Sequence, residues 1–340
     1  MQTRQSMGAR EMTAQKGITM NIQDVKNVTV AGGGTQGSQI ASQIAYKGFH
    51  VTVWVRSEAS IERAKPRFAS IYGQYIDTLE AMKTDPKAYC RGLADKSDLT
   101  PEEVDQLLEQ AKERLHDIQF ETDFDKAFGN ADVVVECINE NKAEKEAFYS
   151  ELAKHLPERT LLLTDSSTML PSMFMDATGR PEKFLTLHFA NQIWRNNLTE
   201  LMKTDKTSQE SFELADQFAR AIGMLPMRLN KEQPGYILNT LLIPWLKAAM
   251  GLYANGVSDP ETIDMTWQLA TGADPTQTPF RKMDKIGLAL CRNIMGMDPS
   301  AKDPNSTLGK SVALLDKYIA EGKTGIAVGE GFYKYTSYDK

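Results

Sequence analysis

The chain has 340 residues, of which 41% are hydrophobic, and its formal net charge is −6 at pH 7. This length is enough for two ordinary cores, and the acidic balance does not favour binding to nucleic acid or to an anionic membrane. No apolar run is expected to reach the roughly 20 residues of a membrane span. The three cysteines lack paired metal-ligand spacing, which predicts reduced thiols, no metal site and a cytoplasmic small-molecule enzyme.

Near the N-terminus, an apolar β-branched segment runs into the motif GGGTQG and then into a segment of small residues. A strand, a glycine-rich turn and a helix in this order are typical of a dinucleotide-binding fold. Gly32 is expected to make the turn, Gly34 to admit a pyrophosphate close to the backbone, and Gly37 to let helix and strand pack closely. Thr35 and Gln36 lie between these glycines and belong to the same predicted cofactor site.

The end of the second predicted strand bears on which nucleotide is bound. A carboxylate about 20 residues after the glycines normally accepts hydrogen bonds from the ribose hydroxyls. Val55 stands at that place, and Arg56 and Ser57 follow it. An arginine and a hydroxyl suit a 2′-phosphate, which favours NADP(H) over NAD(H). In the alternative interpretation Arg56 is a solvated loop residue and NAD(H) is held through its pyrophosphate.

Between the second and third predicted strands the chain departs from the shortest dinucleotide-binding pattern. Apolar residues at helical spacing and a capping box from Thr100 to Glu103 predict an inserted helical hairpin. Its first half carries several basic side chains, namely Arg63, Lys65, Arg67 and Lys83. They suit an anionic carrier such as coenzyme A, or they form a solvated charged face.

Strand and helix signals then alternate until about residue 229, and from Gln233 onward only long helices are indicated. This order predicts an α/β protein in which a Rossmann-type nucleotide-binding domain with the hairpin insertion precedes an all-α domain. We expect a flexible polar tail at 1–24, the Rossmann domain at 25–231 and the helical domain at 232–340.

Four polar residues stand at predicted strand ends or on the first helix of the second domain: Ser167, His188, Glu200 and Asn239. Ligands in such folds bind beyond the carboxyl ends of the strands. An imidazole suits the proton transfer that accompanies hydride transfer at a carbonyl. Glu200 is expected to orient the ring, and Ser167 and Asn239 to donate hydrogen bonds to the substrate oxygen.

Each of these residues also has a structural interpretation. A lone histidine at a strand end is often part of the fold, and the serines and threonine at 166–168 suit a turn. Asn239 lies in an apolar helix, where an amide either contacts another helix or binds a ligand.

Several separated motifs occur in one order along the chain: GGGTQGSQIA, ADVVVECINEN, TDSSTMLPS, LHFANQ, TELMKT, PGYILN and GKTGIAVGEGFYKY. From Val28 onward this order resembles the 3-hydroxyacyl-CoA dehydrogenase family. The resemblance implies catalytic roles for Ser167, His188, Glu200 and Asn239. It further implies that Glu140, Lys145 and Asn191 contact the nicotinamide. It also implies a homodimer formed through the helical domain.

Within the family, the chain is most similar to the branch that contains diketoreductase and, more distantly, lambda-crystallin. Three stretches carry this similarity: TDSSTMLPS, LHFANQIWRNN and GVSDPETIDMTW. The family's usual His-Phe-Phe-Asn-Pro is HFANQ here, and Asp165 replaces an asparagine. The resemblance therefore implies hydride transfer between NAD(P) and a 3-oxo or 3-hydroxyacyl-CoA, or alternatively reduction of a carrier-free β-keto or diketo acid or ester. A crystallin-like nucleotide-binding structural protein and a redox-sensing binding module are the remote alternatives.

Overall fold

The computed structural model describes residues 20–336, which form two compact units that divide between Tyr236 and Ile237. The strands are β1 (Asn27–Ala31), β2 (His50–Trp54), β3 (Gln119–Glu121), β4 (Val133–Glu136), β5 (Leu161–Thr164), β6 (Phe184–Phe189), β7 (Leu198–Lys203) and β8 (Leu225–Leu229). The α-helices are α1 (Thr35–Tyr46), α2 (Glu58–Met82), α3 (Pro101–His116), α4 (Phe124–Phe128), α5 (Lys142–Leu152), α6 (Gln209–Ala221), α7 (Tyr236–Ala254), α8 (Pro260–Thr271), α9 (Pro279–Ile286), α10 (Leu288–Gly296) and α11 (Thr307–Ala320).

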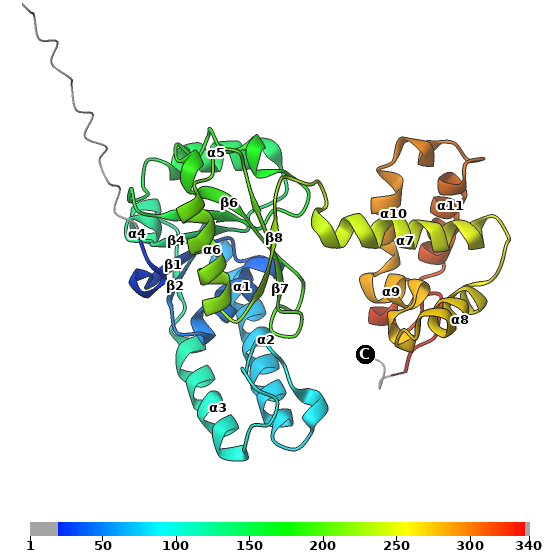
Figure 1. The fold of residues 1–340 in the computed structure, drawn as a ribbon, viewed down its shortest axis with the longest axis horizontal. Helices are drawn as coiled ribbons and strands as arrows, with labels where there is room; N and C mark the ends of the chain where they lie inside the picture. The colour runs from blue at the N-terminus through cyan, green and yellow to red at the C-terminus, as the bar shows by residue number, and fades with distance from the viewer. Residues whose placement is uncertain (1–19, 337–340) are drawn as a thin grey trace, which may run out of the picture. The chain divides into compact units, whose positions relative to one another are not determined.

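In the first unit, the strands form one sheet in the order β3-β2-β1-β4-β5-β6-β7-β8 (Figure 1). The six strands from β3 to β6 run parallel, whereas β7 pairs antiparallel with β6 and parallel with β8. The order reverses between β1 and β4, which is where this class of fold binds nucleotides. The predicted Rossmann-type α/β domain is confirmed.

Helices cover both faces of this sheet and enclose a separate hydrophobic core on each face. On one face, α1, α2, α3 and α6 pack on the apolar side chains of the central strands. On the other face, α4 and α5 pack around Phe128, Phe148 and Tyr149. Strands that are apolar on both sides are expected when helices cover both faces of a parallel sheet.

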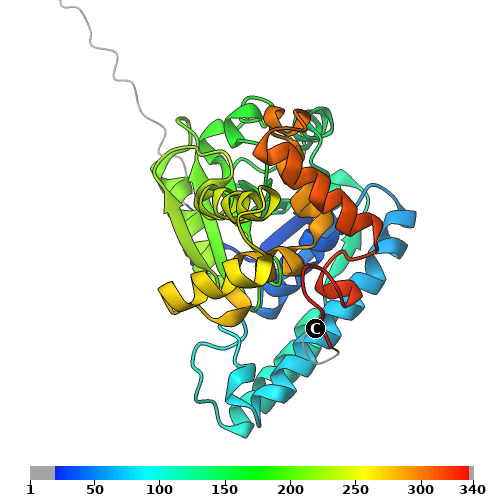
Figure 2. The ribbon, with the colours of Figure 1, turned by 90° about the vertical axis from the view of Figure 1, so that its right-hand side faces the viewer.

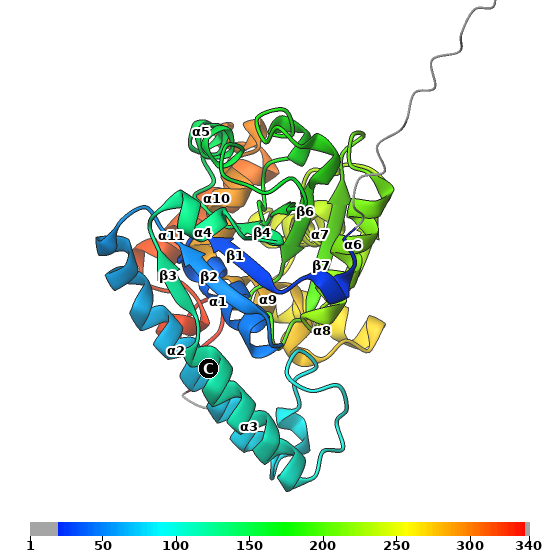
Figure 3. The ribbon, with the colours of Figure 1, turned by 90° about the vertical axis from the view of Figure 1, so that its left-hand side faces the viewer.

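The predicted helical insertion is also confirmed, because α2 and α3 pack against each other and extend from one end of the sheet (Figure 3). The capping box at the start of α3 is present. The Thr100 hydroxyl accepts a hydrogen bond from the Glu103 amide at 3.3 Å, and the Glu103 carboxylate accepts one from the Thr100 amide at 2.8 Å.

The second unit is helical from α7 to α11 (Figure 2, yellow to red), with a core that includes Leu246, Met250 and Phe280. The expectation that no segment reaches the length of a membrane span is wrong. Lys247 is the one charged residue in the 19 residues of α7, and an 18-residue window of this helix has a mean hydropathy of 1.3. A single helix of this kind is weak evidence for membrane insertion.

The N-terminal boundary differs from the expected tail at 1–24, of which residues 1–19 lie outside the described residues. Ile22–Asp24 form a 3-10 helix, and Met20 and Ile22 pack against the first core. Apolar side chains within this stretch therefore join the fold, contrary to the prediction. The expected boundary between 231 and 232 falls between the end of β8 and the division after Tyr236.

Candidate active site

The glycine-rich turn between β1 and α1 has the sterics expected of a phosphate cradle. Gly32 has φ +122°, and a Cβ there would lie 2.6 Å from the Cys137 carbonyl oxygen. A Cβ on Gly37 would overlap the carbonyl oxygen of Gly32. Gly34 has nothing within 4 Å of its Cβ position and stands at the N-cap of α1. An open, side-chain-free helix N-terminus suits an anionic phosphate.

A cavity of about 560 Å³ adjoins this turn, and we call it the glycine-loop cavity. It is lined by the glycine turn, the end of β2, and residues of α2, α4 and α5. Three arginines contribute to its lining: Arg56, Arg63 and Arg67. Arg63 and Arg67, two of the basic residues expected to meet an anionic carrier or to form a solvated face, are exposed and line this cavity.

The lining of the glycine-loop cavity also includes Glu144. The Arg56 side chain is 70% exposed, and its guanidinium lies 3.9 Å from the Glu144 carboxylate. This distance and exposure make a weak ion pair that leaves the guanidinium available to a ligand. The Ser57 hydroxyl lies 3.1 Å from that of Ser60, which lines the same cavity.

Three of the four predicted catalytic residues meet within the first unit. His188 Nδ1 lies 3.2 Å from Glu200 Oε2, and Nε2 lies 3.1 Å from Ser167 Oγ. His188 is 8% exposed and Glu200 is 1% exposed. A buried carboxylate beside the ring stabilises the imidazolium and fixes which nitrogen carries the proton.

Sheet register explains how Glu200 reaches the ring. Glu200 lies inside β7 rather than at a strand end, and it faces His188 directly because β6 and β7 pair antiparallel. Directly opposed residues of antiparallel strands have side chains on the same face. The Nδ1 partner of His188 is therefore fixed by the backbone of two neighbouring strands.

Glu140 organises the loop that carries Ser167. Its carboxylate accepts hydrogen bonds from the hydroxyls of Ser166 and Thr168, each at 2.8 Å, and from the Ser167 amide at 3.3 Å. The Lys145 ammonium lies 3.7 Å from the same carboxylate. Glu140 follows β4 and Lys145 lies on α5. Both are residues for which the resemblance implied contacts with the nicotinamide.

Two buried carboxyl groups were not anticipated. Glu136 is fully buried and accepts hydrogen bonds from Lys145 at 2.6 Å, Tyr149 at 2.5 Å and Thr164 at 2.8 Å. Asp165 accepts a hydrogen bond from the Phe189 amide at 2.9 Å, and burial raises the pKa of its carboxyl well above its usual range. The available signal was an acidic residue at the end of an apolar run, directly after it for Glu136 and one residue later for Asp165.

The remaining predicted residues are placed less directly. The side-chain amide of Gln36 donates to the carbonyls of Phe189 and Ala190, each at 3.2 Å, and so ties the glycine turn to the end of β6. Asn191 is exposed, and its carbonyl accepts a bond from Asn196. Asn239 is half-buried in the first turn of α7, in the second unit. Within residues 20–336, no group of three His, Cys, Asp or Glu residues could hold a metal ion.

Comparison with known proteins agrees over both units. A family model described as the NAD-binding domain of 3-hydroxyacyl-CoA dehydrogenase matches residues 27–233, and the model of that family's C-terminal domain matches residues 235–335. The human mitochondrial hydroxyacyl-coenzyme A dehydrogenase is 31% identical over 333 residues, which cover 98% of each chain. A probable 3-hydroxybutyryl-CoA dehydrogenase of Bacillus subtilis is 28% identical over 320 residues, covering 92% of this chain and 98% of the relative.

Among solved structures, one of a diketoreductase, described as catalysing reactions of dicarbonyl compounds, is 38% identical with a TM-score of 0.78. The match covers 92% of this chain and 99% of the diketoreductase chain. Two consecutive family models and relatives above 30% identity over nearly the full length agree with the NAD-binding architecture of the first unit. The chain belongs to the 3-hydroxyacyl-CoA dehydrogenase family of NAD-dependent oxidoreductases.

Proposed function

We propose that this chain transfers hydride between a nicotinamide nucleotide and C3 of a 3-oxo or 3-hydroxyacyl compound, with His188 as the general acid and base. The observation that carries the proposal is that both ring nitrogens of a nearly buried histidine are within hydrogen-bond distance of a partner. Nδ1 lies beside Glu200 and Nε2 beside Ser167. This places an imidazole, which can accept or donate a proton, beside a hydroxyl able to donate to a substrate oxygen.

A bound nicotinamide supplies the acceptor or donor of the hydride. In the oxidative direction, Nε2 of His188 accepts the proton of the substrate hydroxyl, and Glu200 stabilises the resulting imidazolium. In the reductive direction, the imidazolium returns that proton to the oxygen. Ser167 donates a hydrogen bond to the same oxygen as charge develops there. Asn239 keeps the role of hydrogen-bond donor that the sequence predicts.

The turn at Gly32, packed against Gly37, would hold the pyrophosphate above Gly34, with the backbone of Thr35 and Gln36 beside it. Glu140 and Lys145, 3.7 Å apart, would lie beside the nicotinamide, and Asn191 lies on the loop after β6. The residues present fit a dinucleotide because the turn leaves space above Gly34 and presents a helix N-terminus to it.

Coenzyme A thioesters are the expected substrates, since the human and Bacillus subtilis relatives are named as a hydroxyacyl-CoA and a probable 3-hydroxybutyryl-CoA dehydrogenase. The 38% identity to a diketoreductase favours a second candidate, a dicarbonyl compound without a carrier. An initial-rate panel separates them by comparing acetoacetyl-CoA with its free-acid and ester analogues. A rate only with the thioester supports the first candidate, and comparable or higher rates with the carrier-free compounds support the second.

NADP(H) is the preferred nucleotide in this proposal, within the NAD-binding fold of the family. Val55 offers no acceptor for ribose hydroxyls, and Arg56, Arg63 and Arg67 line the same cavity. Three guanidinium groups in one cavity favour a phosphate, because they form charge-assisted hydrogen bonds to its oxygens.

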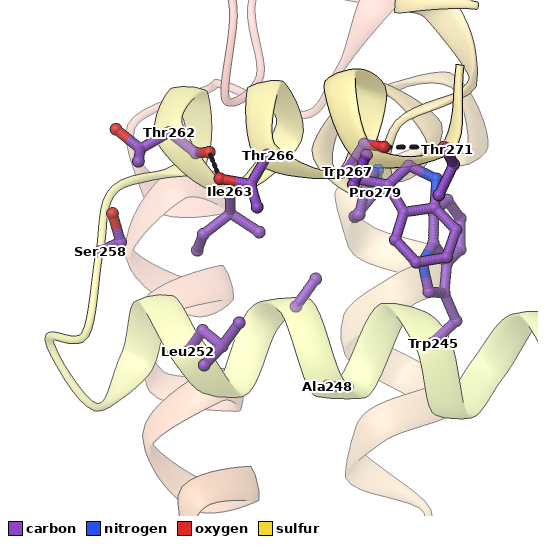
Figure 4. Close-up of a pocket in the computed structure, with 12 residues that line it drawn as sticks. Trp245, Ala248, Leu252, Ser258, Thr262, Ile263, Thr266, Trp267, Thr271 and Pro279 are labelled. Carbon is purple, nitrogen blue, oxygen red and sulfur yellow. Dashed lines mark hydrogen bonds between the residues drawn. The ribbon is translucent and has the colours of Figure 1, made fainter. Parts of the chain in front are cut away.

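The second unit supports the inference of a homodimer. Its α7 and α8 carry large apolar side chains that are exposed, among them Leu241 at 68% and Leu269 at 77%. A cavity of about 460 Å³ between these helices is lined by Trp245, Trp267 and other, mainly apolar residues (Figure 4). Contiguous exposed apolar surface commonly marks a protein interface. Light scattering during gel filtration, on wild type and on Leu241→Glu, tests the assignment.

The compartment remains a prediction. Cys90, Cys137 and Cys291 form no disulfide. Free thiols of this kind fit a reducing compartment such as the cytoplasm.

A further inference from the structure

Tyr236 packs directly on the catalytic histidine. Its ring is parallel to the His188 imidazole, with an interplanar angle of 4° and a centroid separation of 4.3 Å. Its hydroxyl donates a hydrogen bond to the backbone carbonyl of Ser166. Tyr236 is 2% exposed and packs in a small cluster with Leu170, Met202 and Leu229. The tyrosine thus contacts both the imidazole and the loop that carries Ser167.

The stacked ring restrains a motion that the two hydrogen bonds leave free. Bonds at Nδ1 and Nε2 lie near the plane of the imidazole, so the ring can still tilt about the line that joins them. A parallel aromatic ring against one face opposes this tilt. The tyrosine hydroxyl also fixes the position of the Ser167 loop relative to the same face.

The backbone at Tyr236 indicates that this placement is constrained. Tyr236 has φ +55°, and the preceding Gly235 has φ +78°. A bulky residue rarely adopts this left-handed conformation, which persists where surrounding contacts determine it. Tyr236 is also the first residue of α7, the helix that carries Asn239 three positions later. The left-handed residue therefore lies where the chain leaves the first unit.

We propose that Tyr236 is a positioning residue for the His188 proton transfer, acting through the stacked ring and the bond to Ser166. The inference rests on the proposed function, because it takes His188 as the acid and base. The other ionisable groups around this pair are Glu200 on β7, Asp165 after β5 and Glu140 before α5. The electron-rich face of the tyrosine ring adds to the stabilisation of the imidazolium by Glu200.

The test compares Tyr236→Leu, Tyr236→Phe and the control Tyr46→Leu in the full chain. Tyr46 is equally buried at 2% and also donates its hydroxyl to a backbone carbonyl, that of Leu93, at 2.8 Å. Tyr236→Leu is expected to lower kcat about 10-fold to 100-fold with little change in the KM for the nucleotide, because it displaces the reacting nitrogen. The acid limb of the oxidative pH profile should move down by about half a pH unit, since the imidazolium loses a favourable contact.

Tyr236→Phe keeps the stacked ring, so it is expected to retain the pH profile and most of kcat. Tyr46→Leu should lower the melting temperature without moving either quantity. If Tyr236→Leu does not fold, Tyr236→Met replaces it. The proposal is overturned if Tyr236→Leu, or Tyr236→Met in its place, keeps the wild-type kcat and pH profile, or if Tyr46→Leu reproduces the losses of that variant.

A second measurement separates this inference from the function it rests on. With four histidines in the chain, the imidazole resonances can be titrated by NMR without substrate and assigned with His188→Ala. Tyr236→Leu should move the midpoint of the His188 titration downward, and an unmoved midpoint overturns the inference. If instead the proposed function itself is wrong, His188→Ala will retain turnover.

Discussion

His188 and Glu200 are nearly buried and bonded to each other, whereas the three arginines that line the glycine-loop cavity are exposed. His188 is held at 3.2 Å and 3.1 Å on its two nitrogens. Arg56 lies 3.9 Å from its nearest carboxylate with 70% of its side chain exposed. In the proposed function, proton transfer then depends on preorganised geometry, while the choice of nucleotide depends on side chains that can adapt to a ligand.

The largest expected effect comes from the buried region. His188→Ala removes the proposed acid and base and should lower kcat by about 100-fold to 10,000-fold. Nucleotide affinity should change little, because the cradle is formed by the turn before α1. Steady-state rates and a fluorescence titration with reduced nucleotide measure the two quantities. Near wild-type turnover would exclude His188 as the acid and base.

Asn239→Ala tests the donor assigned to the second unit. Losing one hydrogen-bond donor to a developing oxyanion costs about 100-fold to 1,000-fold in kcat. Nucleotide affinity should stay the same, since the cradle lies in the first unit. Kinetics and nucleotide titration are measured together with the melting temperature. A variant that mainly loses stability or nucleotide binding would identify Asn239 as a helix-packing residue.

A smaller effect is expected at the glycine-loop cavity. One charged hydrogen-bonded contact is worth about 1.5 to 3 kcal/mol, so kcat/KM with NADPH should exceed that with NADH by about 10-fold to 100-fold. Val55→Asp with Arg56→Ile should reverse the preference, because an acid accepts from the ribose and repels a phosphate.

Arg228→Ile is the matched control for this change, since Arg228 pairs with Glu213 at 2.6 Å outside the cavity. It should leave the nucleotide preference unaltered. If the unmodified enzyme already prefers NADH, Arg56 does not bind a phosphate and the adenosine is held by other contacts.

The smallest expected effect concerns stability at Asp165. Burial raises the pKa of this carboxyl in the folded state, so the stability it contributes is present below its unfolded pKa and is lost as pH rises. Asp165→Asn should therefore raise the melting temperature near pH 8 and have little effect near pH 3. A gain of about 2–4 °C corresponds to each kcal/mol. Thermal scans across pH measure this, and an equal effect at both pH values would contradict it.

Much of the protein could be predicted from local sequence patterns. The glycine turn, the hairpin with its capping box, and the strands 133–136, 161–164 and 184–189 follow from spacing and residue type alone. Local periodicity and steric need determine such features within a few residues of one another. The residue types of Ser167, His188 and Glu200 also pointed to proton transfer before any contact was known.

Tertiary structure decided the rest. That Glu200 faces His188 from inside a strand depends on antiparallel pairing between β6 and β7, which the sequence does not specify. The arginines of α2 line the glycine-loop cavity because of how that helix packs on the sheet. Glu136, Asp165 and Tyr236 acquired their surroundings from segments distant in the chain. Burial and hydrogen bonding are sums over such contacts, so local sequence determined the elements while packing determined what each polar group can do.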